Sequence, residues 1–246
     1  MTSLNQEYID PVLVSLYGEL NSWAPDNDFY MAMASTTPKR ILDVGAGVGI
    51  QACALAKAGH RVVAIEPSPQ MLKQAQKSIG ADLVQWHQTD AENLPSIKPV
   101  DLAICMGHAF QVFLDQSAVS TVLQAIQRTL KQGGEFIFES RNPLAKSWEN
   151  WEKNTHLHQS TDFGDIECKT TVRSFKNGLL TFANTYEFLR NGEIKTSIST
   201  LRYFTHHQIT QQLRKAGFSV KTIYGDWDQS PFTATSPEMI FVAVKD

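Results

Sequence analysis

The fold of this chain is decided by the stretch Ile41-Leu42-Asp43-Val44-Gly45-Ala46-Gly47-Val48-Gly49. An apolar strand-like run leads into glycines at alternate positions, and a helical pattern begins at Ile50. Glycine permits positive φ and lets a backbone approach a ligand closely, while a helix N-terminus supplies free N–H groups. The stretch therefore predicts a strand, a ligand-binding turn and a helix. We expect Asp43 to orient this turn rather than to touch the ligand.

Short apolar runs alternate with helical patterns on both sides of this stretch. Strands are predicted over 40–44, 61–66, 82–86, 100–106 and 135–140, and helices over 50–58, 69–79 and 117–131. A further helix follows an N-cap at Thr205, and two closing strands, 218–224 and 239–244, form an antiparallel pair at the end of the sheet. This alternation predicts an α/β fold with a doubly wound, mainly parallel, seven-stranded, Rossmann-like sheet.

The pattern changes between residues 143 and 204. Asn177-Gly178 and Asn191-Gly192 are two-residue hairpin signals, and they predict an antiparallel meander over 165–176, 179–190 and 193–204. That register places one group of mostly aromatic residues on a single face: Arg173, Phe175, Phe182, Tyr186, Phe188, Leu201 and Tyr203. Thr170 and Val172 fall on the opposite face. We expect this insert to act as a lid whose aromatic face lies against the main domain or a ligand.

Length and composition set the domain organisation. The chain has 246 residues and a formal charge of −3, so one core of residues 1–142 and 205–246, with a helical cap over 1–38, can carry the 143–204 insert. The near-neutral charge shows no attraction to nucleic acid or to a membrane surface. The three scattered cysteines and the lack of a signal-like N-terminus predict a cytoplasmic protein without structural metal.

Two acidic residues follow neighbouring strands and fit the recognition of a nucleoside. Glu66 ends the second strand, where a carboxylate can accept hydrogen bonds from two vicinal ribose hydroxyls. Asp90, in Asp90-Ala91-Glu92-Asn93-Leu94-Pro95, can accept one from an adenine amino group. A solvated strand-end acid and an Asx turn are the plain structural alternatives.

Together these motifs resemble the class I S-adenosylmethionine-dependent methyltransferases. The resemblance rests on DVGAGVG (43–49), on the segment from Glu66 to Leu72, on DAENLP (90–95) and on LKQGGEFIF (130–138). It implies S-adenosylmethionine as cofactor, S-adenosylhomocysteine as product and no metal. The cofactor contacts that it implies are Gly45, Ala46, Gly47, Gly49, Glu66, Pro67, Met71, Asp90, Ala91 and Met106.

The acceptor is expected at the same sheet edge. His108 follows the fourth strand and Arg141 ends the fifth, so they are the candidate catalytic residues. The structural alternative for His108 is a histidine that only packs in the fold, and the alternative for Arg141 is an ordinary salt bridge. Tyr17, Arg173 and Tyr203 are the candidate acceptor contacts. Methyl transfer is an in-line displacement that mainly needs alignment, so a base is useful only where the acceptor arrives protonated.

The most direct interpretation is a methyltransferase acting on an N or O nucleophile of a small molecule, as a monomer or homodimer. One alternative is a methyltransferase acting on RNA or protein, although the chain has no basic stripe. Another is a non-catalytic protein that binds S-adenosylmethionine or S-adenosylhomocysteine. A third, an NAD-dependent dehydrogenase, predicts a GxGxxG loop that differs from the spacing found.

Overall fold

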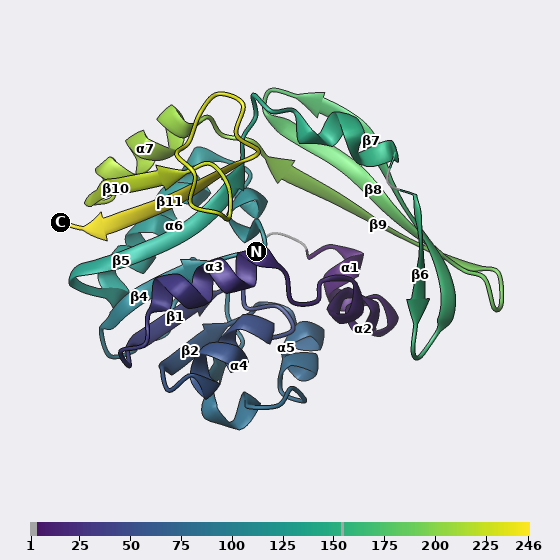
Figure 1. Cartoon of the computed structure of the whole chain (residues 1–246), viewed down its shortest axis with the longest axis horizontal. Coiled ribbons are helices and arrows are strands. Elements are labelled where there is room, and N and C mark those ends of the chain that lie inside the picture. The colour runs from purple at the N-terminus through teal and green to yellow at the C-terminus, as the bar shows by residue number, and fades with distance from the viewer. Residues whose placement is uncertain (1–3, 154) are drawn as a thin grey trace.

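The computed structural model describes residues 4–153 and 155–246, which form two separate sheets (Figure 1). The larger sheet has seven strands in the order β10-β11-β5-β4-β1-β2-β3. β11 runs antiparallel to both of its neighbours, whereas the strands from β5 to β3 pair in parallel. Its strands are β1 (Arg40–Val44), β2 (Arg61–Ile65), β3 (Gln85–His87), β4 (Val100–Cys105), β5 (Leu130–Arg141), β10 (Phe218–Tyr224) and β11 (Glu238–Lys245). The predicted mainly parallel seven-stranded fold is confirmed.

Helices cover both faces of this sheet because its buried strands present apolar side chains in both directions. On one face, Ile41 and Leu102 pack with the third and fourth helices of the chain. On the other face, Leu42 and Phe136 pack with the sixth and seventh. The α-helices are α1 (Gln6–Ile9), α2 (Pro11–Leu20), α3 (Pro25–Ala34), α4 (Ile50–Lys57), α5 (Pro69–Ala75), α6 (Gln116–Thr129) and α7 (His206–Lys215). The 3-10 helices are η1 (Ala81–Leu83), η2 (Ala109–Val112) and η3 (Ser147–Lys153).

Two predicted elements around residue 80 are shorter than expected. The helix predicted over 69–79 ends at Ala75, and Ile79 beyond it is 85% exposed, so no apolar contact extends the helix. The strand predicted from residue 82 begins at Gln85, because η1 precedes it and the Trp86 indole N–H donates back to the Ala81 carbonyl.

The second sheet is antiparallel and has four strands in the order β6-β7-β8-β9. They are β6 (His156–Ser160), β7 (Gly164–Lys176), β8 (Leu179–Phe188) and β9 (Glu193–Arg202). The Asn177-Gly178 turn has two residues, as predicted, with φ of 53° and 75°. The predicted length of the second turn is wrong by two residues. Phe188 pairs with Glu193, so the loop between them has four residues instead of two. Because the shift is an even number, the faces of β9 are unchanged.

A β-bulge at Arg173 corrects the predicted faces of β7. The register shifts between Val172 and Ser174, so Val172 pairs with Phe182 and Thr170 with Asn184. Both therefore lie on the covered face with Phe182, not on the opposite face as predicted. Arg173 itself is exposed.

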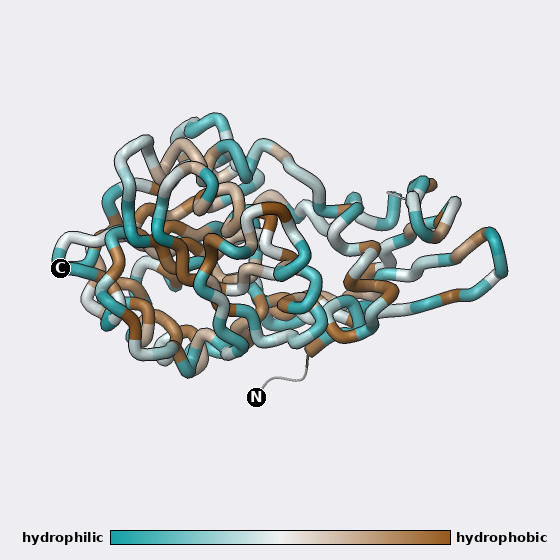
Figure 2. The backbone as a smooth tube through the Cα atoms, turned by 90° about the horizontal axis from the view of Figure 1, so that it is seen from below, coloured by the Kyte–Doolittle hydropathy of each residue, from teal (hydrophilic) through white to brown (hydrophobic). Residues whose placement is uncertain are grey.

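The N-terminal helices α1 and α2 lie between the two sheets, against the inner face of the second sheet (Figure 1). The apolar side chains of Leu13 and Leu16 pack there with Ile166 and Phe188. Hydrophobic segments are concentrated inside the larger sheet and again where these helices meet the smaller one (Figure 2). Among the described residues, none of the helices is both long and apolar enough to cross a membrane.

Candidate active site

The glycine loop after β1 has the conformation that its sequence predicts. Gly45, Gly47 and Gly49 all have positive φ, between 55° and 81°. Gly49 is the N-cap residue of α4, and a Cβ there would lie 2.7 Å from the Trp86 ring, so a larger residue does not fit. At Gly47 a Cβ would meet nothing within 4 Å. The loop is therefore closely packed at its helix end and open at its middle.

Glu66 joins this loop to the end of β2. Its carboxylate accepts the Gly47 N–H at 2.9 Å and the Ser68 N–H at 2.8 Å, and the residue is only 6% exposed. Burial raises the pKa of Glu66, while these two backbone donors act against the rise. An acid is therefore held at a defined position beside the open part of the loop.

Asp43 is buried in β1, directly before the glycine loop. Burial, and then the nearby Glu66, raise the pKa of Asp43 to about 7. Neither of its carboxylate oxygens has a hydrogen-bond partner within the described residues. A buried carboxyl beside the loop is therefore left without a donor among the described residues, and the role of Asp43 in orienting the loop stays a prediction.

Met71 lies under the N-terminal helices. Ser68 caps α5 by accepting the Met71 N–H, and the Ser68 hydroxyl donates to the Tyr8 carbonyl in α1. The Met71 side chain is 1% exposed and packs with Val14 and Val48, next to Tyr17. The helical cap thus contacts the elements that carry the glycine loop and Glu66.

Asp90 and its neighbours form a tight turn after β3. One carboxylate oxygen of Asp90 accepts the backbone N–H groups of Glu92 and Asn93 and the Asn93 side-chain amide, while the other accepts none of the hydrogen bonds between described residues. Ala91 is buried. Met106 and Pro67, at the ends of β4 and β2, are half-buried. The turn itself is the structural alternative considered for Asp90, and it leaves one oxygen for a ligand.

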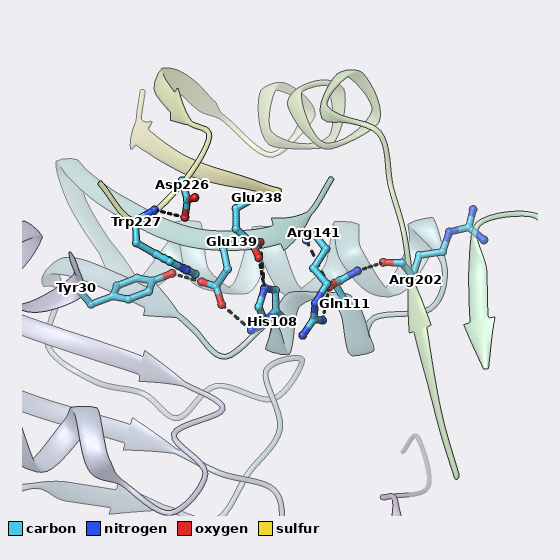
Figure 3. A network of polar contacts seen from close by, with 9 residues as sticks. All are labelled: Tyr30, His108, Gln111, Glu139, Arg141, Arg202, Asp226, Trp227 and Glu238. Atoms are coloured by element: carbon cyan, nitrogen blue, oxygen red, sulfur yellow. Dashed lines mark hydrogen bonds and ion pairs between the residues drawn. The ribbon is translucent and has the colours of Figure 1, made fainter. Parts of the chain in front are cut away.

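His108 lies in the loop after β4, beside the glycine loop. A Cβ on Gly45 would lie 3.4 Å from the Ala109 Cβ, so the two loops are in contact. The His108 Nε2 lies 3.0 Å from a carboxylate oxygen of Glu238, the first residue of β11 (Figure 3). Burial, and then the positive charge of Arg141, lower the pKa of His108 to about 3, so the ring is neutral at physiological pH.

The neutral ring has one arrangement that suits this carboxylate. Nε2–H donates to Glu238, which leaves the Nδ1 lone pair of His108 as an acceptor. Nδ1 makes no hydrogen bond to another described residue. The pair has the form of a carboxylate-oriented imidazole base.

Glu139 holds the backbone of His108. Its carboxylate accepts the His108 N–H at 2.6 Å and the Tyr30 hydroxyl, and it is fully buried in β5 (Figure 3). His108 has a φ of 58°, a left-handed conformation that non-glycine residues rarely adopt. Glu139 therefore supports a strained backbone position that fixes the ring.

Arg141 lies at the same edge, at the end of β5. Its guanidinium donates to the Gln111 side chain at 3.0 Å and lies 5.2 Å from the centre of the Trp151 ring. The Gln111 amide donates to the Arg202 carbonyl of β9, which links the core to the insert (Figure 3). Among the described residues Arg141 forms no ion pair with an acid, contrary to the salt bridge considered as its structural alternative.

The three candidate acceptor contacts are not equivalent. Tyr17 packs beside Val48 of the glycine loop, and burial raises its pKa to about 12. Tyr203 is buried at the end of the insert, with its ring centre 4.7 Å from that of Trp148. Arg173 is exposed on the bulge, and none of its contacts with described residues joins it to the others. The structure brings Tyr17 and Tyr203 close to the site elements but not Arg173.

The sequence interpretation missed the acids of this network. Glu139 stands alone in an apolar strand run, Phe136-Ile137-Phe138-Glu139, which is an available signal for a buried functional acid. Glu238 has no such signal, because it becomes relevant only when β11 pairs with β5.

Comparisons with known proteins agree with this geometry. Residues 41–134 match the family described as a methyltransferase domain. A protein of Geobacillus sp. strain WCH70 that is named as a methyltransferase is 28% identical over 222 residues, covering 84% of this chain and 85% of its own length. The cypemycin N-terminal methyltransferase of Streptomyces is 26% identical, covering 83% of this chain and 82% of its own length.

Solved structures show the same fold. The sugar N-methyltransferase KedS8 from Streptoalloteichus superposes with a TM-score of 0.74 at 16% identity, over 94% of this chain and 91% of its own. The glycine loop, the strand order and the match of residues 41–134 to a methyltransferase domain agree with one another, and together they support a class I S-adenosylmethionine-dependent methyltransferase.

Proposed function

We propose that this methyltransferase acts on a nitrogen or oxygen atom of a small molecule. In this proposal residues 1–142 and 205–246 bind the cofactor, and the 143–204 insert covers the acceptor. Two observations support it: the inner face of the insert packs on α1 and α2, and Gln111 connects it to Arg141. The names of the cypemycin N-terminal methyltransferase and of the sugar N-methyltransferase KedS8 favour nitrogen as the accepting atom.

The residues around the glycine loop fit S-adenosylmethionine. The middle of the loop is open at Gly47, Glu66 has an acceptor for ribose hydroxyls, and the buried Asp43 carboxyl lacks a donor. When bound, S-adenosylmethionine supplies a methyl group on a positively charged sulfur. We assign its binding to Gly45, Ala46, Gly47, Gly49, Glu66, Pro67, Met71, Asp90, Ala91 and Met106.

The single observation that carries the proposed chemistry is the His108–Glu238 pair beside that loop. The neutral ring accepts a proton at Nδ1 from the N–H or O–H of the acceptor, and Glu238 stabilises the imidazolium that results. Arg141 has no acidic partner among the described residues, so it can bind an anionic group of the acceptor. Tyr17 and Tyr203 exclude water around the acceptor. Arg173 is left out because it is exposed.

The proposal is tested by binding and turnover on one protein sample. Calorimetry measures the affinity for S-adenosylmethionine, and the formation of S-adenosylhomocysteine is followed over a panel of small amines and alcohols. Glu66→Gln should weaken cofactor binding about 10- to 100-fold, since a charge-assisted hydrogen bond contributes about 1.5–3 kcal/mol. The matched control is Glu92→Gln, an exposed acid in the Asp90 turn, which should leave the affinity unchanged. Turnover only with RNA or protein would contradict the proposed acceptor class.

A further inference from the structure

A polar cavity lies between the N-terminal helices and the insert. Its volume is about 250 Å³, and its polar lining includes Glu7, Tyr17, Asn21, Thr170, Asn184 and Tyr186. Ligand sites for drug-sized molecules have volumes of about 300–1,000 Å³, so this cavity suits one ring or one end of a small molecule. Tyr17 also packs beside Val48 of the glycine loop, which puts the cavity next to the cofactor region.

Among the described residues that line this cavity, Glu7 is the only acid, and only one of its two carboxylate oxygens accepts hydrogen bonds. The Asn184 amide donates to its Oε1 at 2.6 Å, and the Tyr186 hydroxyl donates to the same oxygen. The other oxygen, Oε2, accepts no hydrogen bond from any described residue. Glu7 is 6% exposed, and within residues 4–153 and 155–246 no cationic side chain pairs with it.

The chemistry of this arrangement favours a cation. Burying a carboxylate is unfavourable unless a positive group or several donors compensate it, and both donors to Glu7 are neutral and on one oxygen. Lys169 and His156 also line the cavity, and Lys169 forms no ion pair with Glu7 in the part of the chain that the structure describes. A ligand with an ammonium group would supply the missing positive charge at Oε2.

We propose that this cavity binds an ammonium group of the acceptor, with the Glu7 carboxylate as its counter-ion. An ammonium held in this way stays protonated and is not a nucleophile, so it anchors the acceptor while a different atom is methylated. That the ligand is the acceptor rests on the proposed function above, whereas the cation preference rests on the cavity alone.

The test compares two sugars that differ in a single group. D-Glucosamine carries an ammonium at about pH 6 where D-glucose carries a hydroxyl. Their binding to the whole protein is measured by saturation-transfer NMR and by titration, without cofactor. The variant is Glu7→Gln, which keeps an acceptor oxygen for Asn184 and Tyr186. The control is Asn5→Ala, which removes a different contact between α1 and the insert, the 2.9 Å bond to Ser199.

We expect glucosamine to bind at least about 10-fold more tightly than glucose, the size of one charge-assisted hydrogen bond. The preference should disappear in Glu7→Gln and persist in Asn5→Ala. Equal binding of the two sugars, binding of neither, or a preference that survives Glu7→Gln would overturn the proposal. The comparison on the unaltered protein decides the matter if Glu7→Gln does not fold.

S-adenosylmethionine affinity, measured on the same sample, separates the two proposals. A protein that binds the cofactor and shows no sugar preference refutes the cation site and leaves the proposed function standing. A preference without cofactor binding refutes the proposed function and leaves the cation site standing.

Discussion

Glu238→Gln tests the imidazole base directly. The Glu238 carboxylate oxygens lie 3.0 and 3.1 Å from the His108 Nε2, and both side chains are largely buried. A hydrogen bond to a charged group contributes about 1.5–3 kcal/mol, and each 1.36 kcal/mol is a factor of ten. Removing the negative charge of Glu238 should lower kcat/KM for the methyl acceptor about 10- to 100-fold, which reaches the lower end of the 10²–10⁴ that a general base supplies.

The pH dependence of kcat/KM gives the sharper result. Burial raises the pKa of Glu238 to about 7. Above this pH the carboxylate accepts Nε2–H and leaves Nδ1 free, whereas below it the protonated carboxyl donates to Nε2 and the His108 proton moves to Nδ1. Activity should therefore rise with pH through about 7. The pKa of His108 lies far below that range, so the titration of His108 does not change kcat/KM near pH 7.

The assay is steady-state formation of S-adenosylhomocysteine from pH 5 to 9 in the unaltered protein and in Glu238→Gln. Glu135→Gln is the control, since that acid lies on β5, the strand that pairs with β11, but forms an ion pair with Lys221 at the protein surface. The reasoning would be refuted if Glu238→Gln kept its activity within about threefold and also kept the rising limb.

Other expectations follow from single features of the fold. Gly49→Ala places a Cβ 2.7 Å from Trp86 at a φ of 81°, so it should destabilise the protein by about 2–5 kcal/mol, measured as a lower denaturation midpoint in urea; an unchanged midpoint would show that the loop adjusts freely. Tyr30→Phe removes a buried donor to Glu139 and should cost about 1–3 kcal/mol in the same assay, and no loss would mean that this bond is dispensable. Because the pKa of Asp43 is raised from 3.8 to about 7, the folded state holds its proton more tightly than the unfolded state, so stability should fall as pH rises between those values. Asp43→Asn should make that fall smaller in thermal scans, because Glu238, whose pKa is also raised to about 7, still contributes over the same range; an unchanged pH dependence in the variant would contradict the reasoning.

The parts of the fold that depend on local sequence could be predicted. The strand, glycine turn and helix from residue 40 onward are encoded in neighbouring residues, and Asn177-Gly178 specifies its turn through the positive φ of both residues. The parts that depend on distant pairing could not. The bulge at Arg173 is one extra residue opposite a partner strand, and β6 forms because it pairs with β7 rather than from its own alternation.

The candidate site divides in the same way. The glycines, Glu66 and His108 follow strand ends and so could be found from their positions along the chain. The partners that define their chemistry are distant in sequence: Glu238 is 130 residues from His108, and Asn184 is 177 residues from Glu7. Only the folded chain brings these groups together, so neither the His108–Glu238 pair nor the Glu7 cavity could be predicted from the sequence.

The account is tested most directly by a crystal structure of the protein with S-adenosylmethionine, read as the distance from the sulfonium methyl carbon to the His108 Nδ1. An acceptor atom between them needs about 3 Å on each side, so a separation of about 6 Å is expected, with the ribose hydroxyls on Glu66. A methyl group directed away from His108, or farther from it than about 9 Å, would contradict the assignment of the base.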